Sequence, residues 1–562
     1  MRLFAALDNF RLLSTDGSFN SLMAICQVLF LVANTSFFRL HAIIIHVRLC
    51  RQSTTMSTLF NRTDWLILSG YIVGISVLGS LFYRRRATAK DFFLGGRHMS
   101  AIPVAISLVA ADMSAISYMG APAWTYQHNL ELVWASWSYL FIAPVVMFLF
   151  MPFYSRFKFY TAYEYLERRF DLKTRLLGSA IFMLMRASHV AIVIYAPSLI
   201  LSLITGLPLI GSVLIIGLCT TLYTTLGGMK AVIWTDVMQF SILMIGLFTV
   251  VRLSISHVPG GVPTVWRVAY GAGRFHLFNF STDLTQVTTF WACGIGGAFM
   301  ALSTLGTDQA YLQRYFTTRS LKEGQRSILL DGIIVVPVSL LLYSVGPILY
   351  TFYCFHPDNL KGLPTMDAIL PFFVMTQLGG WLSGLVIASI FAASMAVMGA
   401  GINALTTATT VDFYKRLLRP HSSDADTVLA GRVGTVAWGA LATIGAMFVG
   451  HLGPIINAFN LINSFLGGPI LGVFLLGMLT RRATGNSAIA GAAAGLASVS
   501  LLVWKTDISF FYYAIVGTVV TLGAGWLIAL LQPPRDASEL GGLVRGLGVQ
   551  PQHPPTLSTT TK

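Results

Sequence analysis

Long apolar runs dominate the chain and are separated by short polar segments. Thirteen runs approach or exceed the roughly 20 residues that a helix needs to cross a hydrocarbon core about 30 Å thick. Backbone groups in lipid must be hydrogen-bonded within their own segment, so continuous runs predict helices rather than the alternating strands of a barrel. The predicted spans are about 65–83, 101–122, 131–153, 177–204, 208–226, 231–252, 286–306, 328–353, 380–411, 430–450, 455–479, 486–504 and 509–531.

The composition agrees with an all-helical membrane protein and excludes an ordinary soluble one. Hydrophobic residues make up 55% of the 562 residues, charged residues 10%, and the mean hydropathy is +0.71. A soluble chain carries about 25% charged residues, which it needs to cover its surface. The 5 cysteines are scattered without a CxxC pair, so we expect neither a disulfide framework nor a cysteine metal site.

The net charge of +15 raises the question of nucleic-acid binding, but the basic residues follow the predicted spans instead. Of the 37 lysines and arginines, 25 lie in loops on one side and 6 on the other; 5 precede residue 56, and Arg186 lies inside a span. Positively charged loops stay in the cytoplasm. We therefore predict a multi-pass protein of the plasma (inner) membrane, with residue 64 outside and the C-terminus inside.

The two ends of the chain do not fit the pattern of spans. The apolar stretch 22–38 is interrupted by polar residues, and as a span it would leave Arg39, Arg48 and Arg51 on the outer side. Residues 1–55 are therefore interpreted as an extension upstream of a start at Met56, with an extra helix as the alternative. The transporter domain is predicted at 56–531, and the Pro/Gly/Thr-rich residues 532–562 as a disordered cytoplasmic tail.

Two spans differ from the uniform Leu/Ile/Val/Ala pattern and lie five spans apart. The second carries Asp112 with several serines, and the seventh carries Gly294, Gly296, Gly297 and Gly306. Interrupted segments at matching positions of two halves indicate a transporter with inverted repeats, here at about 101–252 and 286–479. The alternative is that the glycines only allow neighbouring helices to pack closely.

The candidate functional residues among the ionisable side chains of the predicted spans are Asp112, Arg186, His189 and Asp236. A charge at the bilayer centre costs roughly 2.5–3.5 kcal/mol on insertion scales, so it usually has a task or a partner. Arg186 and His189 are three residues apart and share a helical face, where they could meet an anionic substrate. The alternatives are that Arg186 pairs with an acidic group such as Asp112 or Asp236, and that His189 is a hydrogen-bonded packing residue.

Five motifs in this order resemble the sodium:solute symporter family over roughly residues 64–505. They are DFFLGGRHMS with AADMSAISYMGAPA, TAYEYLERRF, GGMKAVIWTDVMQF, GTDQAYLQRYF and INALTTATTVDFY. The resemblance implies about thirteen transmembrane helices around a leucine-transporter-like core of five plus five inverted helices. FWACGIGGAF and IYAPSL resemble the branch that carries monocarboxylates, vitamins and iodide, whereas AADMSA resembles bacterial proline symporters.

The resemblance also implies a sodium site between the first and eighth core helices. Its contributors here would be the backbone carbonyls of Ala110, Met113 and Ala393, with Asp112 matching an aspartate that proline symporters use. Asp236 matches the family's aspartate of the ion path. A hard cation needs several oxygen ligands, and unwound backbone supplies them without burying a full charge.

This chain departs from the family at one place in that site. The family usually has two hydroxyl residues where this chain has Ala396 and Val397. Either Ser394 and water complete the site, or Asp112 carries more of the coordination, or sodium coupling is weakened. A protonatable Asp112 would also permit coupling to H+.

We therefore expect a secondary active transporter that carries a small organic solute, a monocarboxylate or similar anion, together with Na+ by alternating access. No HExxH, GxSxG or Cys/His cluster indicates an enzyme, and no cofactor or obligate protein partner is indicated. An amino-acid or sugar symporter and a membrane-embedded solute sensor are the alternatives. The expected substrate-binding residues are Ser114, Ser117, Arg186, His189, Trp291, Gly294, Gly296 and Gly297.

Overall fold

The computed structural model is helical throughout its described part, where the only bridge between extended residues joins Met99 and Thr318. The described residues are 60–81, 88–157, 159–363, 365–379, 381–451, 455–533 and 540–545. The predicted all-α membrane fold is therefore confirmed. The doubtful segment 1–55 lies outside the described residues.

Eleven helices in the described ranges are long and apolar enough to cross a membrane, and the bent pair α6 and α7 makes up to 12. The predicted span 208–226 is the first limb of α12, in which the apolar helix Leu209–Leu222 is shorter than a span by the same measure. The spanning helices are α4 (Arg62–Leu81), α6 (Ala101–Asp112) with α7 (Ala115–Gln127), α8 (Val133–Val145) continuing through α9 (Met151–Phe157), α11 (Leu172–Thr205), α12 (Leu209–Ser256, kinked at Gly228), α14 (Gly297–Thr307) with the preceding π-helix (Phe290–Gly296), α16 (Leu321–Phe355), α18 (Trp381–Ala408), α19 (Asp424–Ala446), α20 (Ile455–Leu479), α21 (Gly485–Lys505) and α22 (Phe511–Leu530).

Polar residues set where these helices begin. Asp171 accepts a hydrogen bond from the Thr174 N–H at the start of α11, and Ser320 accepts one from Glu323 at the start of α16. Such caps satisfy N–H groups that the first turn of a helix leaves unpaired. Shorter helices lie between the spans, namely α5 (Ala89–Leu94), α10 (Tyr163–Arg169), α13 (Gly261–Gly271), α15 (Gln309–Phe316) and α17 (Ile369–Gln377).

Two helices break at corresponding places in the two predicted repeats. The first bends by 59° between α6 and α7. The second ends at Thr307 and restarts at Gln309 as α15, with Asp308 in extended backbone conformation between them. The break in the second repeat thus lies at Asp308, two residues beyond Gly306, the last of the glycines in which the sequence indicated an interruption.

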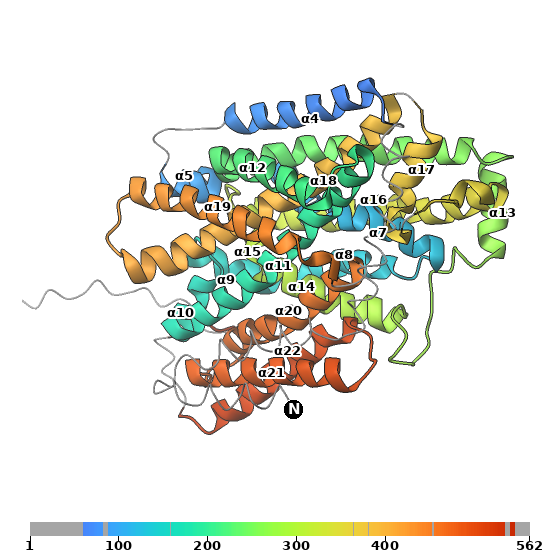
Figure 1. Ribbon diagram of the computed structural model, residues 1–562. Helices are drawn as coiled ribbons and strands as arrows, with labels where there is room; N and C mark the ends of the chain where they lie inside the picture. The colour runs from blue at the N-terminus through green and yellow to red at the C-terminus, as the bar shows by residue number, and fades with distance from the viewer. Residues whose placement is uncertain are drawn as a thin grey trace, which may run out of the picture.

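Helix α18 forms the centre of the protein, since 94% of its most apolar window is buried compared with 28% for α4. It packs against α11, α12 and α4, while α16 packs against α6, α7 and α8. Figure 1 shows α4 at one edge of the bundle and α20, α21 and α22 together at the opposite edge, with α11, α14 and α18 between them. The residues at the two breaks, Met113, Ser114 and Asp308, are buried.

Part of the predicted disordered tail is ordered, which differs from the expectation. Residues 540–545 fold back onto the bundle, where Leu540, Leu543 and Val544 are buried. The Leu543 carbonyl accepts a hydrogen bond of 3.0 Å from the Tyr165 hydroxyl, and the Arg545 N–H donates to Met478. Burial of these apolar side chains stabilises the packing of residues 540–545, although the tail as a whole is rich in Pro, Gly and Thr.

Candidate functional site

The first break frees backbone carbonyls in the interior. Helix α6 ends at Asp112; Met113 leaves the helical conformation, and Ser114 is extended and caps α7 by accepting a bond from the Ile116 N–H. The last carbonyls of a helix have no partner within that helix. The carbonyl of Ala111 accepts a bond of 3.4 Å from the Tyr311 hydroxyl. The carbonyls of the last turn, Ala110 among them, therefore lie where a cation could use them.

Asp112 projects from this break onto two tyrosines of other helices. Its Oδ1 atom accepts hydrogen bonds from the Tyr139 hydroxyl at 2.9 Å and the Tyr311 hydroxyl at 3.2 Å. Tyr139 belongs to α8 and Tyr311 to α15, directly after the second break. The two breaks thus meet at Asp112, and its Oδ2 atom makes no hydrogen bond that the described residues provide.

Arg186 connects α11 to the second break. Its Nη2 forms an ion pair with Asp308, its Nη1 lies 2.8 Å from Nδ1 of His189, and its guanidinium stacks on Tyr311 with 5.7 Å to the ring centre. Both charged side chains are at most 3% exposed. Arg186 does pair with an acidic group, as the alternative interpretation held, but the partner is Asp308 rather than Asp112 or Asp236. The predicted shared face of Arg186 and His189 is confirmed.

Asp236 belongs to a separate ion pair. Its Oδ2 lies 2.9 Å from Nη2 of Arg314 and accepts a bond of 2.5 Å from the Ser107 hydroxyl. The same hydroxyl accepts a bond from Nε of Arg314 at 2.8 Å. Ser107 and Arg314 thereby join α6, α12 and α15 just below the first break.

Helix α18 carries the other expected contributors to a cation site. Ala393, Ala396 and Val397 are buried, and α18 packs against both α6 and α7. The hydroxyl of Ser394 is fully buried and has no hydrogen-bond partner among the described residues. A buried unpartnered hydroxyl is costly unless it binds something. Of the side chains at 393–397, Ser394 is therefore the one suited to hold an ion.

The expected substrate residues of the seventh span contact the Phe280 carbonyl, Phe290, α22 and α8. Trp291 is 39% exposed, and its indole N–H donates to the Phe280 carbonyl at 3.3 Å. A Cβ at Gly296 would lie 2.6 Å from the Phe511 carbonyl oxygen, and one at Gly297 would lie 3.0 Å from Cα of Ala135. These two glycines allow close packing against α22 and α8. Gly294 lies beside Phe290.

Sequence reasoning missed four side chains of this site: Asp308, Tyr311, Arg314 and Tyr139. The first three lie in the motif GTDQAYLQRYF, in which an aspartate between apolar and polar helical segments is a signal of a helix start. Asp308 does cap α15, because it accepts a bond of 2.8 Å from the Ala310 N–H. Tyr139 carried no such signal. In the first repeat, Ser114 is buried and Ser117 half-buried on α7.

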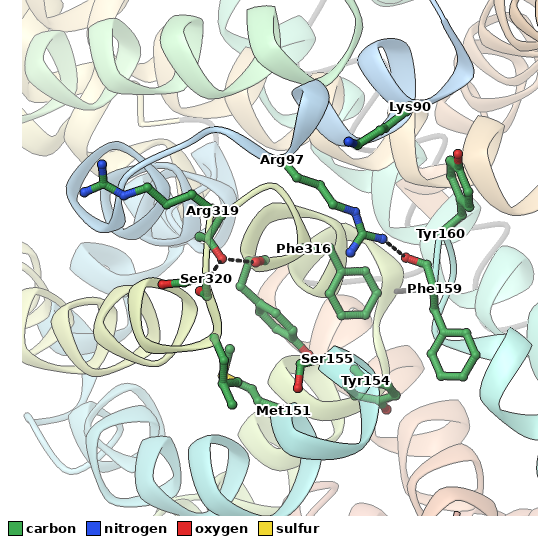
Figure 2. Close-up of a pocket in the computed structure, with 13 residues that line it drawn as sticks. Lys90, Arg97, Met151, Tyr154, Ser155, Phe159, Tyr160, Phe316, Arg319 and Ser320 are labelled. Carbon is green, nitrogen blue, oxygen red and sulfur yellow. Dashed lines mark hydrogen bonds between the residues drawn. The ribbon is translucent and has the colours of Figure 1, made fainter. Parts of the chain in front are cut away.

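A cavity of about 520 Å³ lies away from these residues, where α5, α9 and the link between α15 and α16 meet. Figure 2 shows Lys90 and Arg97 on one side of it and Met151, Tyr154 and Ser155 on the other. Arg97 has a positive φ of 63° and donates from Nη2 to the Phe159 carbonyl at 2.7 Å. Burial lowers the pKa of its guanidinium. The cavity is bordered by the Met99–Thr318 bridge, which joins the bases of the two repeats.

A further buried carboxylate, Asp412, is bound by an arginine and two hydroxyl groups of the protein itself. It accepts from Arg175 at 2.6 Å, from the Thr161 hydroxyl at 2.7 Å and from the Ser179 hydroxyl at 2.8 Å. Nearby Glu167 is partly buried, which acts to raise its pKa, but hydrogen bonds from Arg416 and Arg175 outweigh burial and lower it. This cluster ties α10, α11 and the end of α18 together.

Replacing Asp412 by alanine is expected to lower the free energy of unfolding by ~3–5 kcal/mol, because it leaves Arg175 buried without its main partner. The thermal midpoint of the purified protein in detergent measures this. The matched control is Arg416→Gln, which removes a half-exposed partner of Glu167 and should cost at most about 1 kcal/mol. Equal midpoints for both variants would contradict a structural role of Asp412.

Comparison with known proteins places these features in context. The sequence profile of the sodium:solute symporter family matches residues 92–495. The chain is 31% identical over 473 residues to the sodium/sialic acid symporter NanT of Aliivibrio fischeri, covering 84% of this chain and 93% of that protein. It is 33% identical over 442 residues to the human sodium-coupled monocarboxylate transporter 1, covering 77% of this chain and 72% of the transporter.

Solved structures give the same picture. The fold is similar to the substrate-bound outward-open state of a Na+-coupled sialic acid symporter, with a TM-score of 0.79 and 28% identity. The match covers 85% of this chain and 99% of the symporter. The relatives are symporters rather than enzymes, as the sequence predicted.

Proposed function

Because the chain belongs to the sodium:solute symporter family, we propose that it couples the inward movement of Na+ to the uptake of a small carboxylate anion. The observation that carries this proposal is the pair of helix breaks. One presents Asp112 and free carbonyls to a cation, and at the other Asp308 pairs with the buried Arg186 of α11, the residue that we propose binds an anion. Transporters of this architecture bind ion and substrate at such discontinuous helices.

The proposed sodium site uses the carbonyls of Ala110, Met113 and Ala393, with Asp112 and the hydroxyl of Ser394. The unpartnered Ser394 hydroxyl supports this assignment, since nothing else in the described residues binds it. Ala396 and Val397 supply no oxygen from their side chains, so Asp112 carries more of the charge compensation than a pair of hydroxyls would require. Coupling to H+ through Asp112 is the second candidate.

The proposed substrate site centres on Arg186 and His189. The guanidinium is held by Asp308, whose carboxylate occupies the position that an anionic substrate would use. Bidentate binding of a carboxylate is the geometry for which a guanidinium is best suited. The relatives support an anion, because sialic acid and monocarboxylates are both carboxylic acids. Ser114 and Ser117 complete the proposed lining, with Trp291, Gly294, Gly296 and Gly297 as more distant candidates.

Alternating access would drive the solute uphill. One positive charge entering the cell gains about 2.3 kcal/mol per 100 mV, and a tenfold sodium ratio adds roughly 1.4 kcal/mol. In the proposed orientation residue 64 is outside, and the cavity at Arg97 opens toward the cytoplasm as the exit. Its basic side chains would draw an anion away from the central site.

Uptake into proteoliposomes of the full-length protein tests the proposed function. Labelled lactate, sialic acid, proline and glucose are each supplied with an inward gradient of Na+, of H+ or of neither. We expect Na+-dependent accumulation of one or both carboxylates and no accumulation of glucose. Accumulation of proline or glucose alone would contradict the proposed substrate class, and accumulation driven only by H+ would contradict sodium coupling.

A further inference from the structure

Asp331 on α16 is a buried carboxylate that none of the interactions described above involves. Its side chain is 1% exposed, and its Oδ2 has no hydrogen-bond partner among the described residues. None of the ion pairs found in the described part of the chain includes it. Burying a carboxylate without a hydrogen-bond partner costs free energy, so such a residue within a membrane protein usually marks an ion path.

Helix packing places Asp331 next to the Asp112 site. A Cβ at Gly332 would lie 2.8 Å from Cα of Leu140 and 3.4 Å from the Tyr139 carbonyl oxygen, so the backbone of α16 touches that of α8 at Tyr139. Asp331 and Asp112 lie close enough to interact electrostatically, and Tyr139 interacts with both. Tyr139, which donates to Asp112, therefore lies within electrostatic reach of both carboxylates.

Nearby cations are already committed to other groups. Arg314, which also interacts electrostatically with Asp331, uses its Nε for Ser107, its Nη1 for the Ala310 carbonyl and its Nη2 for Asp236. Arg186 is bound to Asp308 and His189. Two neighbouring carboxylates repel one another, so together they bind a positive charge better than either does alone.

The oxygen atoms around this pair suit a hard monovalent cation. Asp112 has a free Oδ2, Asp331 has a free Oδ2, and the hydroxyls of Tyr139 and Tyr311 lie at Asp112 with the Ala111 carbonyl behind them. They come from α6, α8, α15 and α16; α16 packs on the other three, and α15 packs on α6. Several oxygens converging from different elements are what a sodium or calcium site requires, and two carboxylates without a third suit the smaller charge.

We propose that Asp331 and Asp112 together bind one coupling Na+, with the hydroxyls of Tyr139 and Tyr311 as further ligands. This inference rests on the proposed sodium coupling and adds a carboxylate from α16, at the end of the site opposite α18. A sodium site can form although Ala396 and Val397 have no side-chain oxygens, because Asp331 supplies the missing ligand from the other side of α6. The ion would then hold α16 against both broken helices.

The test is the sodium dependence of thermal stability of the purified full-length protein in detergent, with choline replacing Na+ at constant ionic strength. Wild type should be stabilised by Na+ in the absence of solute. Asp331→Asn should weaken the apparent Na+ affinity at least tenfold. In sodium-free buffer the variant should be as stable as wild type or more so, because the repulsion with Asp112 is gone. Asp331→Ser should behave in the same way.

The matched control is Ser339→Ala, two turns further along α16, where the buried hydroxyl bonds only to the Val336 carbonyl of its own helix. It should leave the Na+ affinity unchanged. If wild type shows Na+-dependent uptake while Asp331→Asn keeps the wild-type Na+ affinity, this inference is overturned and the proposed function stands. A loss of Na+ affinity in Asp331→Asn equal to that in Ser339→Ala would also overturn it. Wild type that neither binds Na+ nor takes up solute with it would overturn the proposed function itself.

Discussion

Replacing Asp112 by asparagine is expected to abolish Na+-driven accumulation of the solute while leaving the protein folded. Asparagine keeps an oxygen that can accept from Tyr139 and Tyr311, so the hydrogen bonds at 2.9 and 3.2 Å survive. What disappears is the negative charge. Losing one partner of a buried charge interaction costs roughly 2–5 kcal/mol, which corresponds to about a 30- to 4,000-fold weaker apparent Na+ affinity.

The measurement is initial uptake rate against Na+ concentration in proteoliposomes. Tyr139→Phe is the graded comparison, because it removes one hydrogen bond to Asp112 but keeps the carboxylate. We expect about a 10- to 140-fold loss of Na+ affinity there, in line with a hydrogen bond to a charged group of about 1.5–3 kcal/mol. A wild-type Na+ dependence in Asp112→Asn would remove Asp112 from the cation site.

The second large effect is expected at Arg186. Arg186→Gln should reduce uptake of the carboxylate at least 100-fold, because the substrate loses its buried cation. This variant also leaves Asp308 buried and unpaired, which by itself costs about 3–5 kcal/mol of stability. Loss of uptake in the single variant therefore has two explanations, binding and folding.

The double variant Arg186→Gln/Asp308→Asn separates the two explanations. It replaces the ion pair by a neutral pair of similar size, so most of the stability should return. If Arg186 binds substrate, uptake by the double variant stays at least 100-fold below wild type while its thermal midpoint recovers. Recovery of both uptake and stability would show that Arg186 serves only to pair with Asp308.

In the proposed site the two helix breaks differ in the charge of the ligand that binds there. At the first break the carboxylate of Asp112 is proposed to bind a cation. At the second break Arg186 is paired with the protein's own carboxylate, Asp308. Tyr311 contacts both, since it donates to Asp112 and lies under the guanidinium of Arg186. Binding of Na+ and binding of the anion would therefore both affect Tyr311, which gives coupling between the two sites a short physical path.

The sequence alone determined the class of fold and the chemistry inside it. Spans of apolar residues are a local property, and their lengths depend only on the thickness of the bilayer. The same locality made Asp112 and Arg186 visible, because a charge within an apolar run is conspicuous without any knowledge of its neighbours. The motif resemblance predicted the family that the comparisons show.

Tertiary structure decided which charges meet. Arg186 pairs with Asp308, 122 residues away, and Asp112 is held by Tyr139 and Tyr311 from two other helices. Such pairings depend on how α6, α8, α11 and α15 cross, and nothing within one helix encodes that. The glycines of the seventh span illustrate the same limit: Gly296 and Gly297 fit close helix contacts, whereas the backbone breaks at Asp308, two residues after Gly306, where a side chain can cap the next helix.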